Sequence, residues 1–177
     1  MRRDQLEHVL RAASTVVGER DILVIGSQSI LGTIPDADLP LEATTSIEAD
    51  LAFLDDSADE KADQVDGAIG ELSKFHETYG YYAQGVSLAT AILPSGWRER
   101  LISLETRDTE PGRGLCLELH DCVVSKLAAG RWKDMDFAGS LLRERLVDAD
   151  TLIERIYLLD VVDEGKTRLH AWVEAHR

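Results

Sequence analysis

The hydrophobic pattern of the chain changes at about residue 119, and this change limits the folds that the chain can adopt. Before it, short runs rich in β-branched residues are separated by turns, as strands are. After it, four segments carry apolar residues at the spacing of amphipathic helices. These segments are residues 119–132, 133–146, 148–159 and 165–177. The pattern predicts an α+β protein with a mixed sheet, in which residues 1–118 form an α/β core and residues 119–177 a helical region packed on it.

Residues 1–14 predict an N-terminal helix, because four apolar residues would share one of its faces. These are Leu6, Val9, Leu10 and Ala13. The segment "ILVIG" (22–26) has the length and the β-branched content of a buried strand, and it ends on small hydroxyl residues. Residues 33–45 contain two prolines and no periodicity, so we expect a surface loop there.

The segment "SIEADLAFL" (46–54) alternates apolar and polar residues, which is typical of a half-buried strand. Ile47, Ala49, Leu51 and Phe53 would share the buried face. Because side chains repeat every second residue along a strand, Glu48 and Asp50 would share the opposite face. A helix is expected further along, around Val65, Ile69 and Leu72.

Composition excludes several classes of function. A net charge of −14 argues against an unaided grip on nucleic acid, which needs a basic surface, but it allows a local basic patch or a bound metal ion. No window approaches the roughly 18 apolar residues that a membrane span requires, and the first residues are charged throughout, unlike a signal peptide. Two cysteines indicate neither a disulfide framework nor a zinc site. We therefore expect a cytoplasmic protein that does not associate with membranes.

The end of the first strand and the face of the second carry residues suited to phosphate chemistry. Gly26 and Ser27 form a turn that would enter a helix, where backbone N–H groups and hydroxyls can contact phosphate oxygens. Glu48 and Asp50 can share Mg²⁺, which needs only one or two protein carboxylates when substrate phosphates supply other ligands. Each feature alone is more often structural than functional, because exposed strand faces are usually polar.

The order of these features resembles the polymerase-beta-type nucleotidyltransferase superfamily, in which a strand, a Gly-Ser turn, a loop and a second acidic strand follow one another. The segment "LHDCVVSKLAAGRWKDMDFAGSLL" (119–142) narrows the resemblance to nucleotidyltransferase-like toxins of the AbiEii and MenT type. Two further stretches, "LPSGWRERL" (93–101) and "GAIGELSKFHETYGYY" (67–82), are similar to a bacterial group of uncharacterised proteins in the same superfamily.

The resemblance implies a role for each matching residue. Glu48 and Asp50 would bind the metal ion and, with Lys126 and Asp134, form the catalytic set. The nucleotide would be bound by Gly26, Ser27, Ser29, Lys126 and Arg131. Lys133 is a further candidate contact for phosphate or RNA. The superfamily has Asp where this chain has Glu48, and Glu105 is the best candidate for the third carboxylate that many members carry.

The resemblance also implies an activity: NTP and Mg²⁺ would be bound, and a nucleoside monophosphate would be transferred to a hydroxyl acceptor. In the toxin branch the acceptor is the 3′ end of tRNA, and a cognate antitoxin protein is the partner. A second hypothesis is a catalytically inactive binding or regulatory module with the same fold. A third is an acidic antitoxin or nucleic-acid mimic.

Several of these residues have a structural alternative. Lys126 can extend past the core to solvent, and Asp134 can act as a partner for a helix N-terminus. Trp97 is better explained by packing than by base stacking. Tyr79, Tyr81 and Tyr82 suit either a pocket lining or a half-buried strand.

Overall fold

The computed structural model describes residues 1–177 of the chain. Five strands form one mixed sheet in the order β3-β2-β1-β5-β4. The central strand β1 runs parallel to β5 and antiparallel to β2, β3 is parallel to β2, and β4 is antiparallel to β5. The strands are β1 (Asp21–Val24), β2 (Glu48–Ala52), β3 (Tyr82–Gly85), β4 (Ile102–Leu104) and β5 (Arg113–Cys116).

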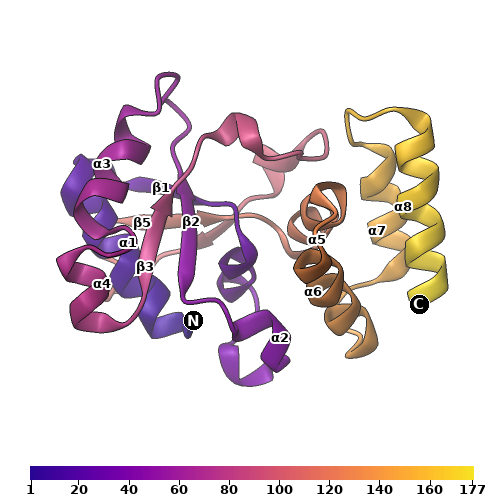
Figure 1. Cartoon of the computed structure of the whole chain (residues 1–177), viewed down its shortest axis with the longest axis horizontal. Helices are drawn as coiled ribbons and strands as arrows, with labels where there is room; N and C mark the ends of the chain where they lie inside the picture. Colours follow the sequence, from indigo (N-terminus) through magenta and orange to yellow (C-terminus); the bar gives the residue numbers. More distant parts are fainter.

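Helices lie on both sides of the sheet, and the C-terminal ones form a separate group on one side (Figure 1). Those before residue 118 are α1 (Arg3–Val17), α2 (Leu41–Thr44), α3 (Glu60–Ile69) and α4 (Lys74–Tyr79). Those after it are α5 (Leu119–Ala129), α6 (Trp132–Arg143), α7 (Ala149–Tyr157) and α8 (Asp163–His176). Short 3₁₀ helices lie between them: η1 (Ser27–Gly32), η2 (Asp36–Asp38), η3 (Leu88–Thr90) and η4 (Trp97–Arg100). The α+β class predicted from the sequence is confirmed.

Both faces of the central strand are buried, which explains its uninterrupted apolar run. Ile22 and Val24 belong to a hydrophobic cluster that includes residues of α1 and α3. Leu23 belongs to a second cluster that includes Ile30 of η1 and residues of the four C-terminal helices. Alternate side chains of one strand therefore join two cores.

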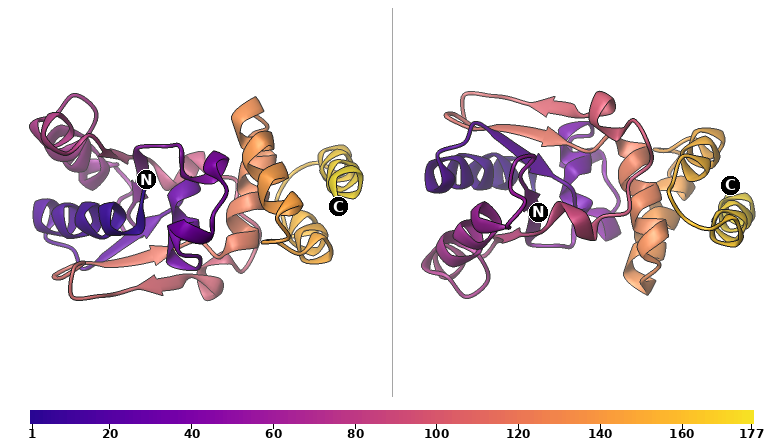
Figure 2. Two further views of the ribbon diagram at one scale, coloured as in Figure 1. Left: turned by 90° about the horizontal axis from the view of Figure 1, so that it is seen from below. Right: turned by 90° about the horizontal axis from the view of Figure 1, so that it is seen from above.

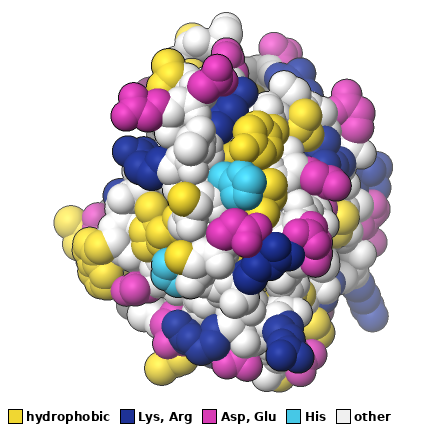
Figure 3. Space-filling view, turned by 90° about the vertical axis from the view of Figure 1, so that its right-hand side faces the viewer, with side chains coloured by type: hydrophobic (Ala, Val, Ile, Leu, Met, Phe, Trp, Pro, Cys, Tyr) yellow, Lys and Arg dark blue, Asp and Glu magenta, His cyan; other side chains and the backbone are white.

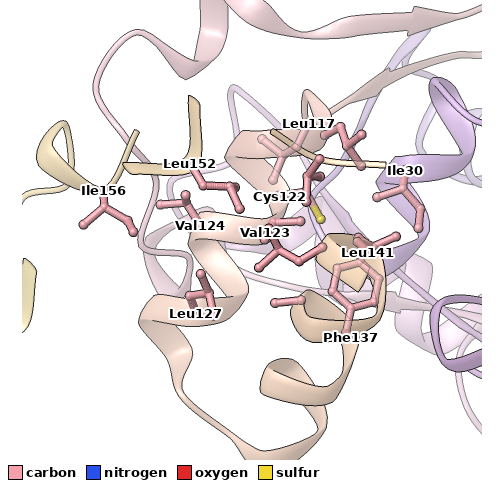
Figure 4. Packing of buried hydrophobic residues seen from close by; sticks show 14 of the residues in the cluster. Ile30, Leu117, Cys122, Val123, Val124, Leu127, Phe137, Leu141, Leu152 and Ile156 are labelled. Carbon is pink, nitrogen blue, oxygen red and sulfur yellow. The ribbon is translucent and has the colours of Figure 1, made fainter. Parts of the chain in front are cut away.

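The C-terminal helices pack against the sheet end through α5 (Figure 2). Figure 4 shows Val123 and Leu127 of α5 among Ile30, Leu117, Phe137 and Leu152, so one continuous cluster joins the sheet to α6 and α7. The proposed division into residues 1–118 and 119–177 stays a prediction.

A buried ion cluster also links the two parts. Asp121 of α5 is fully buried and accepts two hydrogen bonds from Arg100, at 2.8 and 3.1 Å, while Arg155 Nε of α7 lies 3.2 Å from its Oδ1. Burial raises the pKa of Asp121, and the two guanidinium groups oppose that rise. The Asp121 carboxylate therefore connects η4, α5 and α7 through its ion pairs with Arg100 and Arg155.

Three local predictions were wrong. Ile47 is 47 % exposed, because β2 begins one residue later at Glu48. Leu72 is 83 % exposed with a φ of +62°, because α3 ends at Ile69 and the chain turns before α4. The expected loop over residues 33–45 contains η2 and the short helix α2, both of which follow prolines.

The outer face of the C-terminal helices shows acidic and basic side chains interspersed with small hydrophobic groups (Figure 3). No helix of the chain combines the length and the apolarity that crossing a membrane would require.

Candidate functional site

A cavity of about 470 Å³ lies between the sheet, α2 and the start of α6. Seven of the residues predicted from the sequence line it together with neighbouring side chains. These seven are Ser27, Glu48, Asp50, Lys126, Arg131, Lys133 and Asp134. We call this space the site cavity. It is within the size range of pockets that hold small-molecule ligands.

The carboxylate pair of β2 forms one wall of the site cavity. Ala49 and Leu51 point into the cluster shared with α1 and α3, so Glu48 and Asp50 point to the opposite face, toward the C-terminal helices. The parallel register of β2 and β3 places Tyr82 beside Glu48, and the Tyr82 hydroxyl donates a 2.7 Å hydrogen bond to Glu48 Oε2. One oxygen of Glu48 is thereby oriented.

Below about pH 6 the two carboxyl groups share one proton, which is bound by Asp50. Burial, together with the neighbouring Glu48, raises the pKa of Asp50 to about 6, although Lys126 and Arg131 oppose the rise. Burial alone would also raise the pKa of Glu48, but hydrogen bonds from Asp50 and Tyr82 outweigh it and lower that pKa. Near neutral pH this pair carries two negative charges at close range, which favours a bound cation.

Gly26 makes room for Asp50. A Cβ at position 26 would lie 1.9 Å from Asp50 Oδ2, so no other residue fits there without displacing that carboxylate. The backbone reinforces the contact, because the Ile25 N–H donates a 3.1 Å hydrogen bond to the Asp50 carbonyl oxygen. The glycine of the predicted phosphate turn thus has a specific steric role beside the carboxylate pair.

The cationic side chains reach the site cavity from the connection between α5 and α6. Glu118 caps α5 by accepting hydrogen bonds from two backbone N–H groups, and Gly130, whose φ is +70°, directly follows the last residue of the helix. Because left-handed backbone of this kind favours glycine, the chain reverses there and α6 starts two residues later. This reversal brings Lys126 and Arg131 to the same cavity from the two sides of the turn.

Asp134 holds both cations in place. It is 2 % exposed, and it accepts hydrogen bonds of 2.7 and 3.2 Å from Arg131. Lys126 Nζ lies 3.7 Å from Asp134 Oδ1, and the Lys126 side chain is only 13 % exposed. Asp134 therefore orients two positive charges at the cavity, and its own oxygens are occupied by doing so.

Three of the candidate site residues do not line the site cavity. Gly26 lies behind Asp50, and Ser29 is fully buried in η1, where its hydroxyl has no hydrogen-bond partner. Glu105 lies elsewhere, just after β4, and forms an ion pair with Arg20. Trp97 is half-buried against the core around α5, as the packing alternative predicts.

Sequence reasoning missed one residue that supports the cavity wall and several that line the cavity. Tyr82 was left undecided between two roles, because the register that sets it beside Glu48 depends on strand pairing across 34 residues. Glu42 and Asp136 line the cavity from α2 and α6, together with the exposed Trp132. No local pattern marks these three, because only the packing of α2 beside α6 brings them together.

The charge of the site cavity constrains its ligand. Five carboxylates and three cationic side chains line it, so ionised carboxylates outnumber cations. The chain has no cluster of three or more His, Cys, Asp or Glu side chains arranged around a common metal position. The donor set of Glu48 and Asp50 suits a cation such as Mg²⁺ that completes its shell with water and phosphate oxygens.

A comparison with known protein families identifies the family of this chain. The family model described as "Nucleotidyltransferase of unknown function (DUF6036)" matches residues 4–173, nearly the whole chain. The chain belongs to this family. No curated protein and no solved structure gives a significant match. Nucleotidyltransferase membership confirms the superfamily predicted from the strand, turn and acidic-strand order.

For a nucleotidyltransferase of this family, the general expectation is an NTP substrate and a divalent metal ion. The matched region contains both the carboxylate pair of β2 and the α5–α6 turn that carries Lys126 and Arg131.

Proposed function

We propose that the protein binds NTP with Mg²⁺ in the site cavity and transfers a nucleoside monophosphate to a hydroxyl acceptor. The observation that carries the proposal is the meeting of a carboxylate pair and oriented cations in one cavity beside Ser27. Phosphoryl-type transfer depends almost entirely on positioning and charge stabilisation, which are what such a set of side chains provides.

Glu48 and Asp50 would hold the metal ion, which would neutralise charge on the phosphates. The excess of carboxylates in the cavity supports this assignment, because a free triphosphate would be repelled unless a divalent cation accompanied it. Tyr82 keeps Glu48 ionised and oriented through its hydrogen bond.

Lys126 and Arg131 would bind the triphosphate. Asp134 pre-orients both of them, so little side-chain freedom is lost when the nucleotide binds. The acceptor oxygen would form a bond to the α-phosphorus as the bond to pyrophosphate breaks, and the hydroxyl proton would be released to solvent. The cations would stabilise the charge that develops on the departing pyrophosphate.

The test is incubation of the purified protein with labelled NTPs and total tRNA, with and without Mg²⁺. We expect labelled acceptor only when Mg²⁺ is present. Asp50→Ala and Lys126→Ala should abolish the transfer. Lys74→Ala, on α4, is a matched lysine control whose side chain is 91 % exposed, and it should transfer normally. Full activity in either site variant would overturn the residue assignments.

The tRNA 3′ end is the acceptor that we propose, and a toxin of a toxin–antitoxin system the biological role. The support is the resemblance of residues 119–142 to the toxin type, together with the basic turn that those residues form at the cavity. Expression of the wild-type chain should arrest growth, and expression of Asp50→Ala should not. Growth arrest by both chains, or by neither, would contradict the toxin role.

A nucleotide-binding module without transfer is a second candidate. The observation that favours this candidate is Glu48, which stands where the superfamily has Asp. Glu48 has a longer side chain, and Tyr82 already donates a hydrogen bond to one of its two carboxylate oxygens. Calorimetry of nucleotide binding, combined with the transfer assay, separates the two functions. Binding of Mg²⁺ and NTP without transfer to any hydroxyl acceptor supports the module, and transfer supports the enzyme.

A further inference from the structure

Trp132 is the one large aromatic side chain exposed at the mouth of the site cavity. It is 78 % exposed and lines the cavity as the first residue of α6. The two other tryptophans, Trp97 and Trp172, are half-buried against the hydrophobic cluster around α5. Tryptophan is usually largely buried, so an indole left in water beside a polar cavity calls for a partner that the folded chain does not supply.

The neighbours of Trp132 indicate the chemistry of that partner. Arg131 and Lys133 precede and follow it, and both are exposed and line the same cavity. An aromatic face between two cations, beside a cavity suited to phosphates, matches a nucleotide, which has a flat base at one end and anionic oxygens at the other. A purely apolar partner would leave these charges unused.

Resting on the proposed function, we propose that Trp132 stacks on a nucleobase at the mouth of the site cavity. The base belongs either to the NTP or to the terminal nucleotide of an RNA acceptor, and both offer the same π face. Trp132 is then a binding residue. Stacking tolerates any base, so the residue would strengthen binding without selecting one nucleotide.

The test compares wild type, Trp132→Ala and Trp132→Phe in calorimetric titrations with three probes in Mg²⁺. The probes are ATP, inorganic tripolyphosphate, which has no base, and a single-stranded RNA with a free 3′ hydroxyl. Stacking of one base contributes about 1–3 kcal/mol, so Trp132→Ala should weaken binding of a stacked probe about 5- to 150-fold. Trp132→Phe should retain most of the affinity, and tripolyphosphate should bind all three proteins equally.

A loss confined to ATP assigns the stacked base to the NTP, and a loss confined to RNA assigns it to the acceptor. Equal affinity of wild type and Trp132→Ala for both probes would overturn the stacking. An equal loss for ATP and tripolyphosphate would also overturn it, because the cavity and not the base would then be affected. If the wild-type chain binds neither ATP nor tripolyphosphate, the proposed function fails, and the RNA titration alone decides the stacking.

Discussion

The Asp50 carboxylate occupies the space that a side chain at Gly26 would need. A Cβ at position 26 would lie 1.9 Å from Asp50 Oδ2 and 2.6 Å from its Cγ. The φ of Gly26 is −84°, which any residue adopts, so the requirement for glycine is a matter of space and not of backbone strain. This contact joins the end of β1 to the carboxylate pair of β2.

Gly26→Ala should therefore displace Asp50. We expect the free energy of unfolding to fall by about 1–3 kcal/mol, as for overpacked cores, and binding of Mg²⁺ and NTP to be lost. Chemical denaturation and calorimetry measure the two effects. The control is Gly67→Ala on the exposed side of α3, where a Cβ meets nothing within 4 Å and should slightly stabilise the helix. If Gly26→Ala unfolds like wild type and binds nucleotide normally, the steric role is wrong.

The stability of the protein should depend on the protonation of Asp50. Its pKa rises from 3.8 in the unfolded chain to about 6 in the folded one, so the folded state binds the proton more tightly. The stabilisation from this group is complete below pH 4 and is lost as the pH rises through about 6. Glu48, whose pKa is lowered, acts in the opposite sense and loses its contribution as the solution becomes more acidic.

Asp50→Asn resembles the protonated carboxyl at every pH. In metal-free buffer at pH 8 the variant should be more stable than wild type, by on the order of 1–2 kcal/mol, and the difference should vanish near pH 4. Thermal unfolding across this range measures it. Mg²⁺ should raise the melting temperature of wild type at pH 8 and leave that of the variant unchanged. A variant less stable than wild type at pH 8 would contradict the unfavourable burial of the ionised Asp50 carboxylate beside Glu48.

Tyr82→Phe should remove the hydrogen bond that orients the Glu48 carboxylate. The hydroxyl donates a 2.7 Å hydrogen bond to a carboxylate, and loss of such a bond costs about 1.5–3 kcal/mol. Because the bond favours the ionised form, the loss in stability should be larger at pH 7 than at pH 3. Denaturation at both pH values measures it. Tyr79→Phe is the matched control, since that hydroxyl is on a half-exposed side chain and makes no hydrogen bond. Equal losses for the two variants would argue against an oriented Glu48.

Asp134→Asn should leave two cations without their anion. Breaking buried ion pairs costs about 3–5 kcal/mol, and the exposure of Arg131 reduces this, so we expect a loss of about 2 kcal/mol in the free energy of unfolding. The control is Asp136→Asn, two residues further on, whose carboxylate is exposed and has no ion-pair partner. Its stability should change by less than about 0.5 kcal/mol. A similarly small change in Asp134→Asn would show that Asp134 does not anchor the cations.

Features that depend on local periodicity could be predicted from the sequence. Alternation along β2 placed Glu48 and Asp50 on one face, and the apolar run of β1 predicted a buried strand. Helical spacing predicted α5 to α8 and the apolar face of α1, because these patterns are complete within a single element. The limits of this reasoning appeared at element ends, where Ile47 and Leu72 proved exposed.

Which side chains meet depends on how distant elements pack together. Lys126 and Asp134 line the same cavity as the carboxylates of β2 because the C-terminal helices pack on one particular face of the sheet, and no pattern within either segment specifies that face. Strand register set Tyr82 beside Glu48, and the turn between α5 and α6 left Trp132 in solvent. Local sequence sets the orientation of a side chain on its own element. Its neighbours from distant elements follow from the packing that buries the most apolar surface across the whole chain.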